Sequence, residues 1–249
     1  MSATPALNTL DRMAVFLDFD GTLVHIADRP DLVHVPPSLL TTIQEVYDRL
    51  DGALALISGR SIADLDALLM PLQLPVAGVH GIEHRDASGE LQSSPASAIP
   101  EAVRQRVIAL AATDPALILE DKVSSLALHY RQSPAMESLI RNELQEIFTD
   151  LGQDFILQDG KMMLELRPAG ATKGTAVSKF MSEPPFAGRQ PIFIGDDITD
   201  EDAFHVVNQM DGYSVKVGPR DRDSAARYEL PDVAAVRDWL SPLAHPDTG

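Results

Sequence analysis

The sequence predicts an α/β protein in which a parallel sheet carries an inserted α+β domain. Short apolar runs alternate with amphipathic helical segments near both ends of the chain, which is the order of a parallel sheet. The middle of the chain instead reads helix, strand, strand, helix, strand, strand, and this order is not easily threaded into a parallel sheet. With 249 residues, the chain can form two units with cores of their own. We therefore expect a core at residues 1–96 and 168–249 and an inserted domain at residues 97–167.

The first part of the chain predicts three buried strands separated by two helices. Each expected strand is a short, continuously apolar run, as in a parallel sheet that is covered on both faces. The expected strands are Met13–Leu17, Ala53–Ile57 and Val76–Val79, and the expected helices run from an N-cap at Ser38 to Leu50 and from Ile62 to Met70. A hairpin around a turn at Asp86–Gly89 follows, and then a linker at Ser93–Pro100.

The inserted domain is expected to contain two helices and four strands. The first helix covers Glu101–Ala111 and has four apolar residues on one side, namely Val103, Val107, Ile108 and Leu110. The second helix runs from Met136 to Phe148, and the strands are Leu117–Leu119, Ser125–Leu128, Phe155–Leu157 and Met162–Leu164. A turn at Asp159–Gly160 is expected between the last two strands.

The pattern of the parallel sheet resumes in the last part of the chain. The expected helices are Thr175–Met181, Glu201–Met210 and Val233–Leu240, and the expected strands are Pro191–Ile194 and Tyr213–Val217. Thr199 and Asp202 have the spacing of a capping box before the middle helix.

The composition limits the classes of partner. A net charge of −17 disfavours nucleic acid and anionic membranes, so we expect a small-molecule substrate, and we infer no obligate protein partner. The chain has no Cys, which excludes disulfides, thiolate metal sites and Cys nucleophiles and is compatible with a reducing compartment. No apolar run approaches the ~18 residues of a membrane span, and residues 1–12 carry no apolar signal core. A cytoplasmic location is the expectation.

The first expected strand ends in two carboxylates, Asp18 and Asp20. Residues two apart in extended chain point to the same side, so both carboxylates would face one small volume. Their mutual repulsion calls for a proton or a cation between them. The following Gly21 allows a sharp turn, and Thr22 offers a hydroxyl. The carboxyl end of a parallel strand is where open α/β sheets bind ligands, although Asp-Gly also occurs in turns without any chemical role.

Other expected strand and helix ends carry groups that fit phosphoryl transfer. This reaction needs a nucleophile, a cation that offsets charge, and donors to the phosphoryl oxygens. Mg²⁺ prefers oxygen ligands, which Asp18, the backbone carbonyl of Asp20, and Asp196 could supply. Ser58 and Lys173 could bind phosphate oxygens. Taken singly, these features also fit a turn, a solvated lysine and a capped acidic helix start.

At all four of these motif positions, and in the same order, the chain resembles the haloacid dehalogenase-like (HAD) hydrolases. The resemblance covers residues 13–81 and 168–240 and implies an HAD-like Rossmannoid core with a parallel sheet and an inserted cap of the second type (C2). It implies that Asp18 is the nucleophile and forms an aspartyl-phosphate, and that Asp20 is the general acid and base. Lys173 would screen negative charge and Ser58 would orient phosphate, with Mg²⁺ as cofactor. Asp197 and Asp200 would be weaker metal contacts or supports of the metal ligands.

A narrower resemblance, to the trehalose-6-phosphate phosphatase family, spans Val15 to Val217. It rests on six segments: Ser58-Gly59-Arg60, Gly78-Val79-His80-Gly81, Glu120-Asp121-Lys122, His129-Tyr130-Arg131, Lys161–Glu165 and Gly195–Glu201. The resemblance implies that Glu120, Lys122 and Glu165 bind sugar hydroxyls, which both donate and accept hydrogen bonds. We assign further substrate contacts to Thr22, Gly59, Arg60, His80 and Gly81. His80 could instead pack beside the nucleophile loop, and His129 and Arg131 could brace the cap.

The resemblance therefore implies a Mg²⁺-dependent phosphatase that converts trehalose 6-phosphate to trehalose and phosphate, the last step of trehalose biosynthesis. One alternative is a different sugar phosphatase of the HAD superfamily, acting on sucrose phosphate or a hexose phosphate. Two others are a catalytically silent relative that binds a sugar phosphate and a phosphomutase, which would use the same residues.

Overall fold

A computed structural model describes residues 12–27, 29–93, 99–122, 125–151, 154–219 and 223–244. The chain divides into two compact units, the first formed by Met1–Ser93 with Thr172–Gly249 and the second by Ser94–Ala171. The expected boundary between residues 96 and 97 lies outside the described residues. The expected linker at Ser93–Pro100 lies largely outside them as well.

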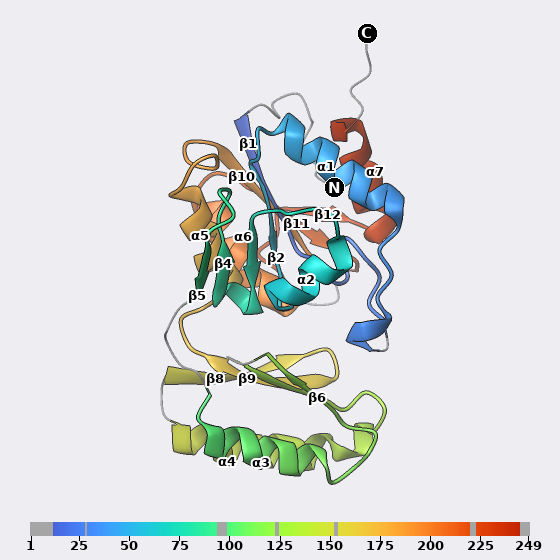
Figure 1. Ribbon diagram of the computed structural model, residues 1–249, viewed down its shortest axis with the longest axis vertical. Coiled ribbons are helices and arrows are strands. Elements are labelled where there is room, and N and C mark those ends of the chain that lie inside the picture. The colour runs from blue at the N-terminus through green and yellow to red at the C-terminus, as the bar shows by residue number, and fades with distance from the viewer. Residues whose placement is uncertain are drawn as a thin grey trace. The chain divides into compact units, whose positions relative to one another are not determined.

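The first unit is built on an eight-stranded sheet with β1 near its middle (Figure 1). The strands, in spatial order, are β12 (Tyr228–Leu230), β11 (Tyr213–Val217), β10 (Gln190–Gly195), β1 (Met13–Leu17), β2 (Leu54–Ile57), β3 (Val76–Gly78), β4 (Glu83–Arg85) and β5 (Leu91–Ser93). The pairs from β12 to β3 are parallel, and the hairpin β4–β5 adds two antiparallel pairs. The predicted parallel sheet and hairpin are confirmed, whereas β12 was not predicted.

Helices cover both faces of this sheet. They are α1 (Pro37–Arg49), α2 (Ile62–Leu69), α5 (Lys173–Met181), α6 (Glu201–Gln209) and α7 (Val233–Ala244). Helix α1 packs against α7 and α5 packs against α6, which places one pair on each face (Figure 1). All five residues of β1 are buried, which explains why its sequence is continuously apolar rather than alternating. The ring of Phe16 stacks on Phe186 at 5.4 Å and lies 6.0 Å from Phe180 of α5, so strand and helix share one core.

The second unit has a four-stranded antiparallel sheet and two helices. The strands, in spatial order, are β6 (Ile118–Asp121), β7 (Leu126–His129), β9 (Met163–Pro168) and β8 (Phe155–Gly160), and the helices are α3 (Glu101–Ala111) and α4 (Glu137–Leu151). Both helices pack onto one core with the sheet, through residues such as Val107, Ile140 and Leu144. The second unit therefore has its own hydrophobic core.

Two local predictions are wrong, one of a turn and one of the start of a helix. Asp159 and Gly160 continue β8 by pairing with Leu164 and Met163, so the turn lies at residues 161–162 instead. Helix α1 begins at Pro37, because proline fits the first helical position, where its missing N–H is not needed. Its N-cap is Pro36 and not Ser38.

Other local details also differ from the predictions. Before α6, the reciprocal capping contacts join Asp197 and Asp200, not Thr199 and Asp202. Ile108 of α3 is 40% exposed and does not lie on the buried side with its neighbours. Among the described residues, no helix is long and apolar enough to cross a membrane. The cytoplasmic location stays a prediction.

Candidate active site

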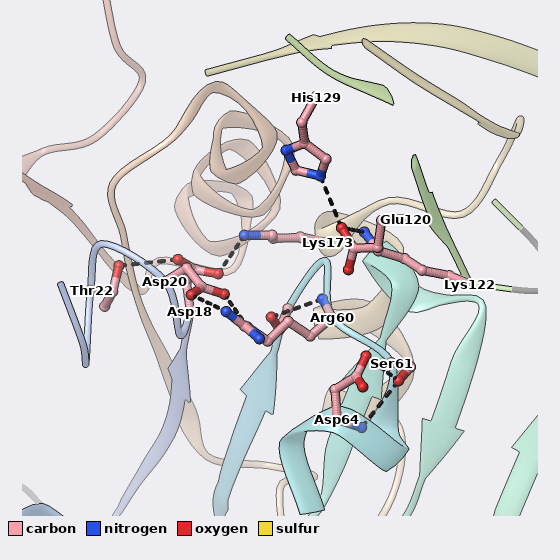
Figure 2. A network of polar contacts seen from close by, with 11 residues as sticks. Asp18, Asp20, Thr22, Arg60, Ser61, Asp64, Glu120, Lys122, His129 and Lys173 are labelled. Atoms are coloured by element: carbon pink, nitrogen blue, oxygen red, sulfur yellow. Dashed lines mark hydrogen bonds and ion pairs between the residues drawn. The ribbon is translucent and has the colours of Figure 1, made fainter. Parts of the chain in front are cut away.

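Asp18 follows β1 directly and is buried with a lysine against it. The ammonium of Lys173 donates to Asp18 Oδ1 at 2.7 Å (Figure 2). The same ammonium donates to Asp200 Oδ1 at 2.6 Å. The hydroxyl of Thr22 donates to the other oxygen of Asp18 at 3.2 Å. Three segments that are far apart in sequence thus meet at the carboxyl end of the central strand.

Lys173 is held in place by the start of α5, of which it is the first residue. Thr172 is the N-cap and exchanges hydrogen bonds with Thr175 in a capping box. A lysine at this position opposes the helix dipole, and the carboxylates of Asp18 and Asp200 offset that opposition. Gly81 lies close against the same turn, since a Cβ built on it would be 2.9 Å from the carbonyl oxygen of Thr172.

Burial and charge act together on the ionisation of this cluster. Burial raises the pKa of the Asp18 carboxyl well above its usual value; the Lys173 ammonium opposes this, and the carboxylates of Asp200 and Asp196 add to it. For Lys173, burial by itself would lower the pKa, but Asp18 and Asp200 outweigh burial and raise it. The lysine is therefore held protonated between Asp18 and Asp200.

Three carboxylates of this cluster suit a hard divalent cation. Oxygens of Asp18, Asp196 and Asp200 lie within 4.8 Å of one another. Gly21 has φ +86°, and a Cβ there would lie 2.3 Å from Asp196 Oδ2, so the turn after β1 leaves room only for glycine beside this carboxylate. An all-oxygen set of this kind fits Mg²⁺. The side chain of Asp20 is not part of the cluster, and a contact from its backbone carbonyl stays a prediction.

Asp20 instead pairs with Arg60. The guanidinium donates from Nε to Asp20 Oδ2 at 2.6 Å and from an Nη to Oδ1 at 2.8 Å (Figure 2). The backbone N–H of Arg60 donates to Ser58 Oγ at 3.1 Å, and Ser58 is only 1% exposed. Ser58, Arg60 and Asp20 are thus joined in one chain of contacts.

His80 lies against the loop that carries Ser58. A Cβ on Gly59 would be 2.8 Å from the His80 ring, so the ring covers this glycine. The backbone N–H of His80 also donates to the carbonyl of Ser58 at 2.9 Å. These contacts place His80 beside the Ser58 loop; a contact with substrate stays a prediction.

The second unit contains a separate polar cluster around Lys122. Its ammonium lies 3.6 Å from Glu120 Oε2 (Figure 2). It also lies 3.4 Å from Glu165 Oε1. His129 Nε2 lies 3.1 Å from the same oxygen of Glu120, and Ser125 Oγ donates to Glu165 Oε1 at 2.7 Å. The three residues assigned to sugar binding are thus brought together, and His129 braces one of them. Ser125 was not predicted to take part.

The charges of this second cluster stabilise one another. Burial would lower the pKa of Lys122, but Glu165 and Glu120 outweigh it and raise that pKa. Burial acts to raise the pKa of Glu120, but the hydrogen bond from His129 and the charge of Lys122 lower it below the usual value. Lys122 and Glu120 are therefore each held in the charged form by their neighbours.

Lys216 is a buried residue near the first cluster that the sequence reading missed. It is 3% exposed within β11, and its ammonium donates to the backbone carbonyl of Asp196 at 2.9 Å. A lysine between two valines of an expected buried strand was the available signal, since buried lysines are rare without a partner. The contact ties β11 to the residue that carries one of the clustered carboxylates.

The comparisons with known sequences identify one family. A family model described as trehalose-phosphatase matches residues 16–234. A probable trehalose-phosphate phosphatase of Sinorhizobium fredii is 41% identical over 240 residues, which cover 96% of this chain and 91% of that protein. The trehalose-6-phosphate phosphatase of Escherichia coli is 43% identical over 242 residues, which cover 96% of this chain and 89% of that protein.

Solved structures agree with this fold. A protein described as related to trehalose-6-phosphate phosphatase has a TM-score of 0.79 and 26% identity, covering 93% of this chain and 96% of its own. A phosphatase of the haloalkanoate (HAD) superfamily from Bacteroides thetaiotaomicron has a TM-score of 0.60 and 16% identity, covering 98% of this chain and 99% of its own, and this likeness shows the fold alone. The predicted HAD-like α/β class is confirmed.

Proposed function

Because the chain belongs to the trehalose-phosphatase family, we propose that it hydrolyses trehalose 6-phosphate to trehalose and inorganic phosphate. The observation that supports the chemistry most directly is the buried group of Asp18, Lys173 and Asp200 at the end of β1. A carboxylate that is fixed by an ammonium at the ligand-binding end of a parallel sheet is suited to attack a phosphoryl group.

The reaction would proceed in two displacements on phosphorus. A carboxylate oxygen of Asp18 attacks phosphorus, the bond from phosphorus to the sugar oxygen breaks, and Asp20 gives that oxygen a proton. A water molecule then attacks the phosphorus of the aspartyl-phosphate, Asp20 takes its proton, and phosphate leaves from Asp18. Lys173 offsets the negative charge, and the hydroxyl of Ser58 orients a phosphoryl oxygen. When bound by Asp18 and Asp196, Mg²⁺ would supply positive charge for the transferring group.

We assign sugar recognition to the second unit, acting as the cap. Trehalose presents hydroxyls that donate and accept hydrogen bonds, and Glu120, Glu165 and Lys122 offer two acceptors and a donor within one cluster. A site of buried polar groups discriminates strongly, because an unsuitable ligand leaves those groups unpaired. The cluster thus supports a specific carbohydrate rather than phosphate esters in general.

Phosphate release from a panel of esters tests this function. We expect rapid release from trehalose 6-phosphate, slow release from sucrose 6-phosphate, glucose 6-phosphate and p-nitrophenyl phosphate, and loss of release with a chelator of divalent ions. Mg²⁺ added in excess of the chelator should restore the rate. Equal rates on all four esters would contradict the assignment to trehalose 6-phosphate but leave the phosphatase chemistry in place. No release from any of them would contradict the function itself.

Glu120→Ala should separate sugar recognition from phosphoryl chemistry. Loss of one partly buried hydrogen-bonding carboxylate should reduce kcat/KM for trehalose 6-phosphate by roughly 10- to 100-fold. The value for p-nitrophenyl phosphate should change little, since this ester has no sugar. Asp121→Ala is the matched control, because Asp121 is the next residue of β6 and pairs with Arg104. Equal losses on both esters in Glu120→Ala would argue against a sugar contact.

A further inference from the structure

The side chain of Arg60 forms an ion pair with Asp20. Two donors of its guanidinium meet the two oxygens of one carboxylate, at 2.6 and 2.8 Å. The Arg60 side chain is 10% exposed, whereas that of Asp20 is 32% exposed. The arginine is therefore the buried partner, and the carboxylate is the partner open to solvent.

The backbone of Arg60 is held in place as well as its guanidinium group. The backbone N–H of Arg60 is held by Ser58 Oγ, and its guanidinium carbon lies 5.7 Å from the centre of the Phe19 ring. Phe19 is fully buried and stands between the two aspartates of the β1 loop. The arginine thus links the Ser58 loop to the loop that carries Asp18 and Asp20.

Two-point contact fixes the direction of a carboxylate as well as its charge. A planar guanidinium that donates to both oxygens holds the carboxylate in its own plane, which a single ammonium cannot do. Each carboxylate oxygen has a second lone pair that this contact leaves available. Asp20 can therefore be held in one orientation and still exchange a proton with another group.

We propose that Arg60 is a positioning residue that acts on the reaction through Asp20, rather than a contact to the sugar. The inference rests on the proposed function, in which Asp20 moves a proton in both displacements. It replaces the earlier assignment of Arg60 to substrate binding with a role in aligning the acid and base. General acid–base catalysis requires the proton-exchanging atom within hydrogen-bond reach of its target, so a carboxylate that rotates freely loses most of its effect.

The test compares Arg60→Ala and Arg60→Lys on two esters, trehalose 6-phosphate and p-nitrophenyl phosphate. Arg60→Ala should lower kcat on both by roughly 100-fold, because the second displacement uses Asp20 whichever ester is cleaved. KM for trehalose 6-phosphate should change by less than about 3-fold, since no sugar contact is lost. Arg60→Lys keeps the positive charge but lacks the planar pair of N–H donors, so its kcat should lie between those of Arg60→Ala and wild type. If Arg60→Ala folds poorly, the kcat and KM of Arg60→Lys test the positioning role of Arg60 instead.

Arg85→Ala is the matched control. Arg85 makes the same kind of two-point contact, with Asp66 at 2.7 and 2.8 Å, in the same unit but outside the site. Arg85→Ala should lower the unfolding temperature and leave kcat of the folded enzyme unchanged. A loss of kcat that is specific to Arg60 therefore does not reflect loss of a buried ion pair in general.

Guanidinium ions added to Arg60→Ala provide the decisive measurement. They should raise kcat of this variant several-fold and have no effect on the double variant Arg60→Ala with Asp20→Asn. A raised KM for trehalose 6-phosphate with unchanged kcat on the aryl ester would overturn the proposal, as would rescue of the double variant. A wild-type enzyme that cleaves the aryl ester but not trehalose 6-phosphate would refute the proposed substrate only. The Arg60 comparison would then be decided on the aryl ester.

Discussion

Asp18→Asn is expected to abolish phosphate release while the protein stays folded. The amide has nearly the shape of the carboxylate, and its oxygen can still accept from Lys173 at the position of Asp18 Oδ1. It is a poor nucleophile, so the covalent route is lost and kcat should fall by more than about a thousandfold. Phosphate release and acid-stable trapping of labelled phosphoenzyme measure the two parts of this expectation, and both signals should disappear together.

The control for this substitution is Asp66→Asn. Asp66 also accepts from a buried arginine in the same unit, but it lies outside the cluster around Asp18. It should retain kcat, and circular dichroism should show that both variants are folded. Substantial turnover by Asp18→Asn would assign the nucleophile to another residue.

Lys173→Met should damage both activity and stability. The lysine is 3% exposed, and its removal leaves the buried carboxylates of Asp18 and Asp200 without their shared donor. Breaking a buried ion pair by removing one partner costs about 3–5 kcal/mol of unfolding free energy. The rate should fall as well, because the charge that offsets the phosphoryl group is gone.

Unfolding measured with and without Mg²⁺ tests the electrostatic origin of this loss. A divalent cation among the same carboxylates would offset part of the missing charge, so the loss should be larger with a chelator than with Mg²⁺. Lys179→Met is the matched control, because Lys179 is on the same helix and its ammonium donates to Gln92 at the surface. An unfolding free energy of Lys173→Met equal to that of wild type would show that the buried pair does not stabilise the fold.

The strands and helices could be predicted closely where burial sets the pattern. The run Met13–Leu17 is apolar throughout because β1 is buried on both faces, and its predicted bounds are those observed. Helix α3 was likewise predicted over its observed range. Local turn and cap signals were weaker guides. The Asp-Gly pair at 159–160 resembles a turn, but its pairing with β9 keeps both residues in the strand.

The candidate site could be predicted as a set of residues, but not as a set of contacts. The ends of strands and the starts of helices can be predicted from sequence, so Asp18, Lys173 and Asp196 could be expected at one edge of the sheet. Which side chain meets which depends on rotamers and on segments that are far apart in sequence. The pair of Asp20 with Arg60 joins residues 40 apart, and Lys216 reaches a backbone carbonyl 20 residues away. No local pattern encodes either contact.

The order of strands in the first sheet also determines when the enzyme becomes competent during its synthesis. Strand β1 is made early, but one of its two neighbours is β10, which is made only after the whole second unit. The strands of the second unit are contiguous in sequence, so that unit can fold first as the chain leaves the ribosome. Throughout this interval one edge of β1 lacks its partner, and an unpaired apolar strand edge invites association with other chains. The nascent protein thus carries Asp18 at the end of a strand with an open edge until residues 190–195 emerge, and that interval is when chaperones would be needed most.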